Sequence, residues 1–225
     1  MSSIVPGIHS SLLTNQPQDV STTLQLLLVL TVLSLAPAIL ILMTSFTRII
    51  IVLSFVRTSL STQQMPPNQV LIGLALFLTF FIMSPVYSEA NHDALQPYLK
   101  GKITQHQAIK KAEAPFKVFM AKQTREKDLD LFMEYGKYKM PKKITAIPMT
   151  ALVPAFTISE LKTAFQMGFM IFIPFLVIDM VVASILMAMG MMMLPPVMIS
   201  LPFKILLFIM VDGWYLIVKS LLVSF

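Results

Sequence analysis

Long runs without a charged residue constrain this chain more than any other feature. Residues 24–47 are twenty-four consecutive positions without Asp, Glu, Lys or Arg. At about 1.5 Å per residue, a helix of that length spans the roughly 30 Å hydrocarbon core of a bilayer. Further apolar segments follow at residues 70–86, 158–189 and 202–223. We therefore predict an all-α integral membrane protein with two hydrophobic helical hairpins and a partly helical polar insert between them.

Composition narrows the possible classes of protein. The chain has 225 residues, of which 56% are hydrophobic and 12% are charged. Soluble domains carry about 25% charged residues. An ordinary soluble enzyme is therefore nearly excluded.

The distribution of apolar and charged residues divides the chain into four stretches. We predict a flexible N-terminal segment at residues 1–20, a first hydrophobic hairpin at 21–86, a polar basic insert at 87–148 and a second hydrophobic hairpin at 149–225. The insert holds twelve Lys and Arg against seven Asp and Glu, a net charge of +5. We expect two helices in it, the first beginning with a capping box at Thr104 and Gln107. Their apolar stripes are expected to pack into a small core.

Residues suited to catalysis or metal binding are few. The chain has no cysteine, and its three histidines, His9, His92 and His106, all lie outside the hydrophobic segments. It contains neither the HExxH zinc motif nor a P-loop. We therefore expect no enzyme activity, no catalytic residue, no cofactor and no metal site.

Charged residues within or directly beside the hydrophobic segments include Arg48, Asp179, Lys204, Asp212 and Lys219. A charge costs about 2.5–3.5 kcal/mol at a bilayer centre, so these side chains should face protein or water. If residues 202–223 form one helix, the last three charges lie within about 80° on one face. We interpret the five as a polar seam that stabilises assembly, with Asp179 pairing with Lys204 or with another subunit. The alternative is an ion or proton relay, as in an ion-coupled transporter or a proton channel.

The third hydrophobic segment is predicted to be a helix over about residues 158–189. Thr157 and Glu160 fit a capping box at its start. Gly190 suits the left-handed residue that ends a helix.

Methionine gathers at the end of this predicted helix. Nine of the eighteen methionines fall within residues 167–198, including Met191, Met192 and Met193 at an expected hairpin tip. An apolar tip must be buried in protein, enter the membrane or line a hydrophobic constriction. Methionine side chains are flexible and polarizable, so a ring of such tips would form a deformable seal. Ordinary filling of a core is the alternative.

Several stretches of the sequence are characteristic when taken together. They read TSFTR at 44–48, MPPNQVLIGLALFL at 65–78, PAFTISELKTAF at 154–165, PFLVID at 174–179, MGMMMLPP at 189–196 and VDGW at 211–214. With them the chain resembles the FliP family of flagellar type III export proteins over about residues 24–225. Injectisome proteins of type III secretion share much of this pattern, but TREKDL at 124–129 is closer to the flagellar branch.

The resemblance implies a structural, pore-forming role. FliP-like subunits form a homopentamer and join FliQ and FliR in an export gate of the bacterial inner membrane, through which unfolded flagellar axial proteins pass. The gate contacts further export-apparatus proteins and seeds the rod of the flagellar basal body. The methionine loop, here Met191, Met192 and Met193, acts as a gasket around the closed pore.

The resemblance also implies a location. The insert and much of the assembly are expected on the periplasmic side, with contacts to membrane lipid and none to nucleic acid. An injectisome export gate is the alternative function.

Overall fold

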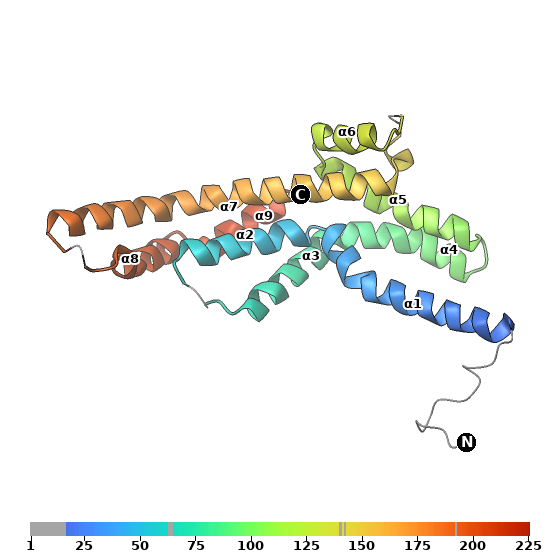
Figure 1. The fold of residues 1–225 in the computed structure, drawn as a ribbon, viewed down its shortest axis with the longest axis horizontal. Helices are drawn as coiled ribbons and strands as arrows, with labels where there is room; N and C mark the ends of the chain where they lie inside the picture. Colours follow the sequence, from blue (N-terminus) through green and yellow to red (C-terminus); the bar gives the residue numbers. More distant parts are fainter. Residues whose placement is uncertain (1–16, 63–64, 140, 142, 192) are drawn as a thin grey trace, which may run out of the picture. The chain divides into compact units, whose positions relative to one another are not determined.

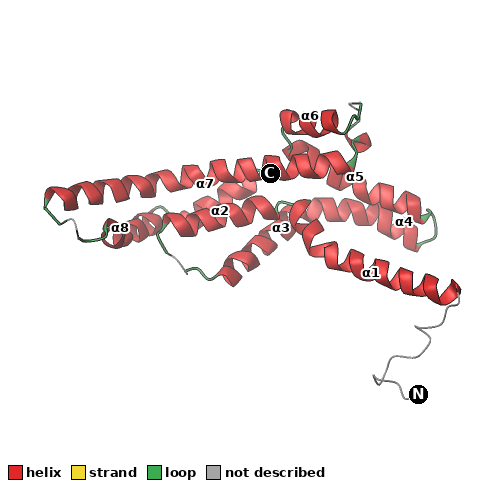
Figure 2. Cartoon of the chain, viewed as in Figure 1, coloured by secondary structure: helices red, strands yellow, loops and turns green. Residues whose placement is uncertain are grey.

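The computed structural model describes all residues except 1–16, 63–64, 140, 142 and 192. Within these described residues the regular elements are helices (Figure 2). The predicted all-α fold is therefore confirmed. The chain forms two compact units, residues 1–40 and 41–225.

The first hydrophobic run lies mainly in α1 (Pro17–Leu42). Residues 17–20 of the predicted flexible segment begin this helix, and residues 1–16 lie outside the described residues. Leucines such as Leu28 and Leu33 are exposed. The uncharged run from 24 to 47 is not a single helix, because α1 ends at Leu42 and α2 (Phe46–Ser59) begins four residues later.

The centre of the second unit is α2. Ile49, Val52, Leu53 and Val56 are fully buried, and spacings of three and four residues place them on one face of the helix. The helix packs against α3 (Asn68–Ala90) and α7 (Met149–Ala188) (Figure 1). A short helix that is apolar on most sides is typical of a buried element.

α2 and α7 approach each other closely at Gly168. A Cβ atom there would lie 2.5 Å from the ring of Phe55, so the position requires glycine. The ring of Phe55 also meets Phe165 edge-on, with ring centroids 5.5 Å apart. Close packing therefore fixes α2 against the middle of α7.

The second apolar helix is longer than the predicted segment at 70–86. α3 continues through Pro85 into a π-helical turn (Asn91–Leu95) and then α4 (Gln96–Leu99). The continuous helical stretch Asn68–Leu99 has 32 residues. Its length is sufficient to cross a bilayer with some tilt.

The insert contains the two predicted helices, α5 (Gln105–Gln123) and α6 (Glu126–Tyr135), followed by a 3₁₀ turn (Ile144–Ala146). The capping box is confirmed, since the Gln107 amide donates to Thr104 Oγ1 at 3.4 Å and the Thr104 amide donates to Gln107 Oε1 at 3.2 Å. The apolar stripes pack into a core, as predicted. Its buried members are Met120, Met133, Ile147, Ala151, Leu152 and Phe156.

The helix predicted over 158–189 is longer than expected. α7 has 40 residues, begins at Met149 and continues through Pro154 and Pro174. Thr157 therefore lies inside the helix, where its Oγ1 donates to the carbonyl of Val153 at 2.9 Å. The predicted capping box of Thr157 and Glu160 is wrong, because the helix does not begin there.

The last apolar segment forms two helices, α8 (Pro196–Met210) and α9 (Gly213–Val223), which are bent by 62° at the break. Within the described part of the chain, two helical stretches, Asn68–Leu99 and Met149–Ala188, are long and apolar enough to cross a membrane. The bent pair α8–α9 would be a third, broken span. The predicted membrane character is therefore supported by helix length as well as composition.

Candidate functional site

The connection between α7 and α8 is the predicted hairpin tip, which we call the methionine tip (residues 189–194). Gly190 has a positive φ of 75°. The Met191 amide donates to the carbonyl of Leu186, and the Gly190 amide donates to that of Met187, both at 3.0 Å. This pair of bonds closes a helix around a left-handed residue. The predicted role of Gly190 is confirmed.

The described side chains of the methionine tip are exposed. Met193 is 98% exposed and Met191 is 43% exposed, whereas Met192 lies outside the described residues. Met191 and Met193 therefore do not fill the core of their own chain. A protruding apolar tip needs cover from membrane or from another protein surface. The gasket role of the three methionines stays a prediction at this point.

A buried cation lies in the middle of α8. Lys204 is 1% exposed, and its Nζ donates to Asp179 Oδ2 and to Ser61 Oγ, each at 2.6 Å. Ser200 Oγ donates to the second oxygen of Asp179 at 2.5 Å. We call these four residues the lysine cluster. The predicted pairing of Asp179 with Lys204 is confirmed, and it joins α7, α8 and the turn after α2.

Asp212 and Lys219 do not join this cluster. Asp212 is exposed at the break between α8 and α9, where it has a positive φ of 50°. Lys219 is exposed on α9, with its Nζ 5.8 Å from the ring centroid of Tyr215. The expectation that Lys204, Asp212 and Lys219 share one helix face is wrong, because the segment is two bent helices.

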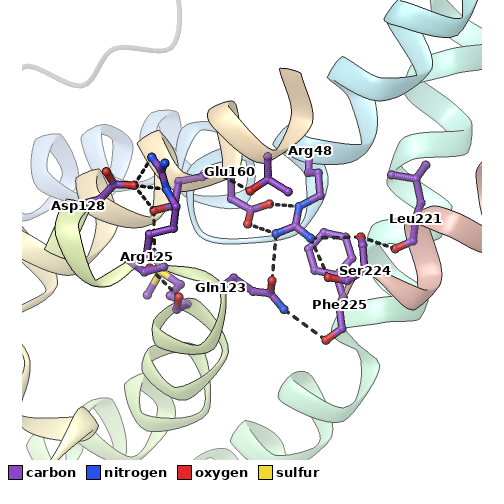
Figure 3. A network of polar contacts seen from close by, with 12 residues as sticks. Arg48, Gln123, Arg125, Asp128, Glu160, Leu221, Ser224 and Phe225 are labelled. Carbon is purple, nitrogen blue, oxygen red and sulfur yellow. Dashed lines mark hydrogen bonds and ion pairs between the residues drawn. The ribbon is translucent and has the colours of Figure 1, made fainter. Parts of the chain in front are cut away.

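A second buried ion pair lies near the start of α2 (Figure 3). Arg48 is 2% exposed and Glu160 is fully buried. Arg48 Nε donates to Glu160 Oε2 at 2.9 Å, and Nη2 pairs with the other carboxylate oxygen. This two-point geometry is the strong form of an arginine–carboxylate contact. It connects α2 directly to α7.

Further partners surround the same guanidinium group. Nη1 donates to the carbonyl of Ser224 at 2.9 Å, and Nη2 donates to Gln123 Oε1 at 3.0 Å. The guanidinium carbon lies 4.0 Å from the ring centroid of Phe225, a cation–π contact. We call Arg48, Gln123, Glu160, Ser224 and Phe225 the arginine cluster. It joins α2, α5, α7 and the residues after α9 (Figure 3).

Glu160 is the member of this cluster that sequence reasoning missed. The capping-box pattern gave its carboxylate a local role, although a second signal was present in the sequence. An acidic residue in an apolar helix needs a cation, and the same argument had been applied to Asp179. Extending it to Glu160 would have predicted a buried cationic partner, and the structure shows that this partner is Arg48.

A third polar contact ties α6 to α7 at the edge of the region in Figure 3. Ser159 Oγ donates to Asp128 Oδ2 at 2.6 Å, and Arg125 Nε donates to the same oxygen at 2.8 Å. Burial alone would raise the pKa of Asp128. The hydrogen bonds from Ser159 and Arg125, with the charges of Arg125 and Lys127, outweigh it and lower that pKa below its usual value. Asp128 is therefore a carboxylate at neutral pH.

The two ion-paired clusters fasten α2 to α7 at both ends. Arg48 lies near the first turn of α2, and Ser61 follows its last turn. Their partners on α7, Glu160 and Asp179, are nineteen residues apart in the sequence, or about 28 Å along a helix. The hairpin that carries the methionine tip is therefore held by two separated polar contacts and by the apolar packing between them.

The described residues contain no group of three or more His, Asp or Glu side chains arranged to hold a metal ion. The most deeply buried charged residues are Arg48, Glu160 and Lys204. Arg48 and Glu160 bond each other, and Lys204 bonds Asp179. The arrangement of the site thus suits a structural function and the presentation of the methionine tip.

The comparisons with known proteins all lead to one family. Residues 29–221 match the FliP family. The chain is 72% identical over 211 residues to the flagellar biosynthetic protein FliP of Bacillus subtilis, a match that covers 94% of this chain and 96% of the relative. It is 53% identical over 221 residues to the protein of that name from Pectobacterium carotovorum, covering 98% and 86% of the two chains. The corresponding protein of Aquifex aeolicus is 50% identical over 205 residues, covering 90% and 86%.

Proposed function

The chain belongs to the FliP family, and from this premise we propose that it is a pore-forming structural subunit of the flagellar protein export gate. In this proposal it forms a homopentamer and assembles with FliQ and FliR subunits in the bacterial inner membrane. Unfolded flagellar axial proteins cross the membrane through the assembly, which also seeds the rod of the basal body. The insert and much of the assembly lie on the periplasmic side. The chain's role is structural and not enzymatic.

The methionine tip carries this proposal. Met193 is 98% exposed at the end of a rigid helical hairpin, so its side chain is available to contact something outside the chain. A ring of such tips, one from each subunit, would present flexible apolar side chains around a narrow opening. Hydrophobic constrictions of this kind exclude water and ions by dewetting, while methionine can repack around passing chains of different sequence.

The contacts of the polar clusters favour a structural role over ion or proton transport. Lys204 is buried and pairs with the partly exposed Asp179. Asp212 and Lys219 are exposed and lie outside this pair. A proton or ion relay would need these charges along one water-filled path. The proposal therefore assigns Arg48, Asp179 and Lys204 to holding the hairpin in place, and not to moving ions.

A flagellar function is favoured over an injectisome function. The relatives that share 50–72% identity with the chain over at least 205 residues are named flagellar biosynthetic proteins. The proposal accordingly takes rod, hook and filament proteins as the export substrates.

The gasket is tested by making its side chains polar. Cells that produce the Met191→Ser/Met193→Ser variant with FliQ and FliR partners should leak small ions faster than cells with the parent chain. The reason is that a polar ring stays wet where an apolar ring excludes water. Inner-membrane permeability is measured with no export substrate present.

The matched control for this test is Met65→Ser. Met65 is 71% exposed but lies in the turn between α2 and α3, so its variant should not leak. If the assembled tip variant leaks no more than the control, the gasket role is wrong.

A further inference from the structure

The methionine tip contains the most exposed methionine that the structure describes. Met193 is 98% exposed, and Met189 and Met191 beside it are 66% and 43% exposed. The chain has no cysteine, so methionine thioethers hold its only sulfur atoms. No residue at positions 189–194 is charged. The chemistry that the tip offers to a small reactive molecule is therefore that of the thioether, which is oxidised to the sulfoxide.

The methionines of the core are shielded from such oxidation. Met83 and Met120 have no exposed surface, and Met133 is 2% exposed. A polar sulfoxide at these positions would be buried without a hydrogen-bond partner, which costs free energy. Met193 loses almost no packing when it becomes polar, because nearly all of its surface is already exposed. The fold therefore separates methionines that must stay reduced from methionines that can be oxidised without unfolding the chain.

Several other exposed methionines lie in helices with the length and composition of membrane spans. Met170 and Met180 belong to the candidate span of α7, and Met210 ends α8 in the bent pair α8–α9. Hydrocarbon around such a helix excludes polar solutes. The methionine tip lies outside these helices, in the connection between them, where water on either side of the proposed ring brings a dissolved oxidant to it. Met65 is also exposed in a connection, the turn between α2 and α3, and provides a control outside the tip.

A peroxide supplies the oxidant. A lone pair of the thioether sulfur attacks one oxygen of hydrogen peroxide, the O–O bond breaks and an S–O bond forms. The sulfur is oxidised by two electrons, the peroxide is reduced, and both of its protons leave in one molecule of water. The step requires no acid or base from the protein, and the tip has none in its sequence. The product, methionine sulfoxide, is a polar side chain in place of a flexible apolar one.

We propose that the methionine tip is a site of reversible oxidation by peroxide, and that its sulfoxide form makes the closed gate permeable to water and small ions. This inference rests on the proposed gasket function. An apolar constriction excludes ions because water leaves it, and sulfoxide oxygens at Met191 and Met193 hold water there by accepting hydrogen bonds. Methionine sulfoxide reductases restore the thioether from either epimer, so the seal is recovered once the oxidant is removed.

Mass spectrometry of the assembled complex tests the oxidation itself. Membranes that contain the chain with FliQ and FliR partners are treated with limiting hydrogen peroxide, and the sulfoxide at each methionine is followed over time. Met193 should be oxidised at least about tenfold faster than Met120, because the fold shields the sulfur of Met120 from a dissolved oxidant. Oxidation of Met193 no faster than that of Met120 would overturn the proposal.

Permeability of the inner membrane tests the consequence of oxidation. A peroxide pulse should raise ion leakage in cells with the parent chain, relative to cells that lack the chain, and added methionine sulfoxide reductase should reverse the rise. The Met191→Leu/Met193→Leu variant keeps apolar side chains of similar volume but forms no sulfoxide at these positions. It should stay closed before the pulse and show a rise at least about threefold smaller after it. The matched control, Met65→Leu, should leak after the pulse as much as the parent chain does.

The outcomes separate this inference from the gasket on which it rests. If the Met191→Ser/Met193→Ser variant does not leak, the gasket function is wrong and the inference falls with it. If that variant leaks, but a pulse that oxidises Met193 causes equal leakage in the parent chain and in the Met191→Leu/Met193→Leu variant, the gasket stands and oxidation of the tip does not control it. A rise that the reductase does not reverse would also contradict the proposal, because the oxidation would then be damage and not a switch.

Discussion

Replacing Arg48 with alanine is expected to destabilise the folded chain by about 3–5 kcal/mol, because the substitution leaves the buried carboxylate of Glu160 without its cation. Glu160 is fully buried and bonded at both oxygens by Arg48. The substitution also removes the bonds to Gln123 and Ser224. The measurement is the free energy of unfolding of the purified chain in detergent, with accumulation in the membrane as a second readout.

A control on the same helix separates burial from charge. Arg57 is half-buried, and its side chain donates to the neutral amide of the exposed Asn68. Arg57→Ala leaves no buried charge unpaired, so it should change stability by about 1 kcal/mol or less. The double variant Arg48→Met/Glu160→Leu removes both charges together, and should be less destabilised than either single alanine variant. Equal effects of Arg48→Ala and Arg57→Ala would contradict the assignment of the arginine cluster as a structural contact.

The second large effect is expected at Lys204. Lys204→Ala should cost about 3–5 kcal/mol, because it leaves the carboxylate of Asp179 without its cation and opens a cavity beside Ser61. Lys204 is 1% exposed and is bonded to both residues at 2.6 Å. Because the cluster joins α8 to α7 and to the turn after α2, amide hydrogen exchange should rise in all three segments.

Lys219 provides the matched comparison for Lys204. It is a lysine of the same apolar segment, but it is exposed and its contact is a ring at 5.8 Å. Lys219→Ala should therefore change stability by less than about 1 kcal/mol. A Lys204→Ala chain as stable as the Lys219→Ala chain would mean that the lysine cluster contributes nothing to the fold.

The sequence predicted the features that depend on local patterns. Uncharged runs indicated the apolar helices, the spacing of Thr104 and Gln107 indicated a capping box, and Gly190 indicated the end of α7. Each of these follows from residues within a few positions of one another, and each agrees with the structure. Asp179 and Lys204 were also paired correctly, because a buried charge in an apolar segment has few available partners.

The features that were missed depend on distant parts of the chain. Thr157 and Glu160 have the spacing of a capping box, but residues 149–156 extend the helix before them and Arg48 takes the carboxylate. The bend at Asp212 and Gly213 depends on the ring of Phe208 being close enough to require glycine. Neither contact leaves a pattern in the neighbouring sequence, so only the tertiary structure reveals it.

Together these contacts explain how a mostly apolar chain presents an apolar tip. The arginine cluster joins α2 to α7, and the lysine cluster joins α8 to α7 and to the turn after α2. The two clusters lie about 28 Å apart along α7. The hairpin beyond them ends in a left-handed glycine that exposes Met191 and Met193. A framework held by buried polar contacts, with exposed methionine side chains at its end, is the arrangement that the proposed gate requires.

The most direct test places a single cysteine at the tip. The chain has no cysteine, so Met193→Cys in the assembled complex offers one thiol per copy of the chain to a stalled export substrate that carries a single cysteine. The matched control is Leu28→Cys, since Leu28 is 65% exposed but lies in α1. We expect a cross-link from position 193 and none from position 28. If an assembled, exporting complex gives no cross-link at position 193 for any substrate position, the methionine tip does not line the export path.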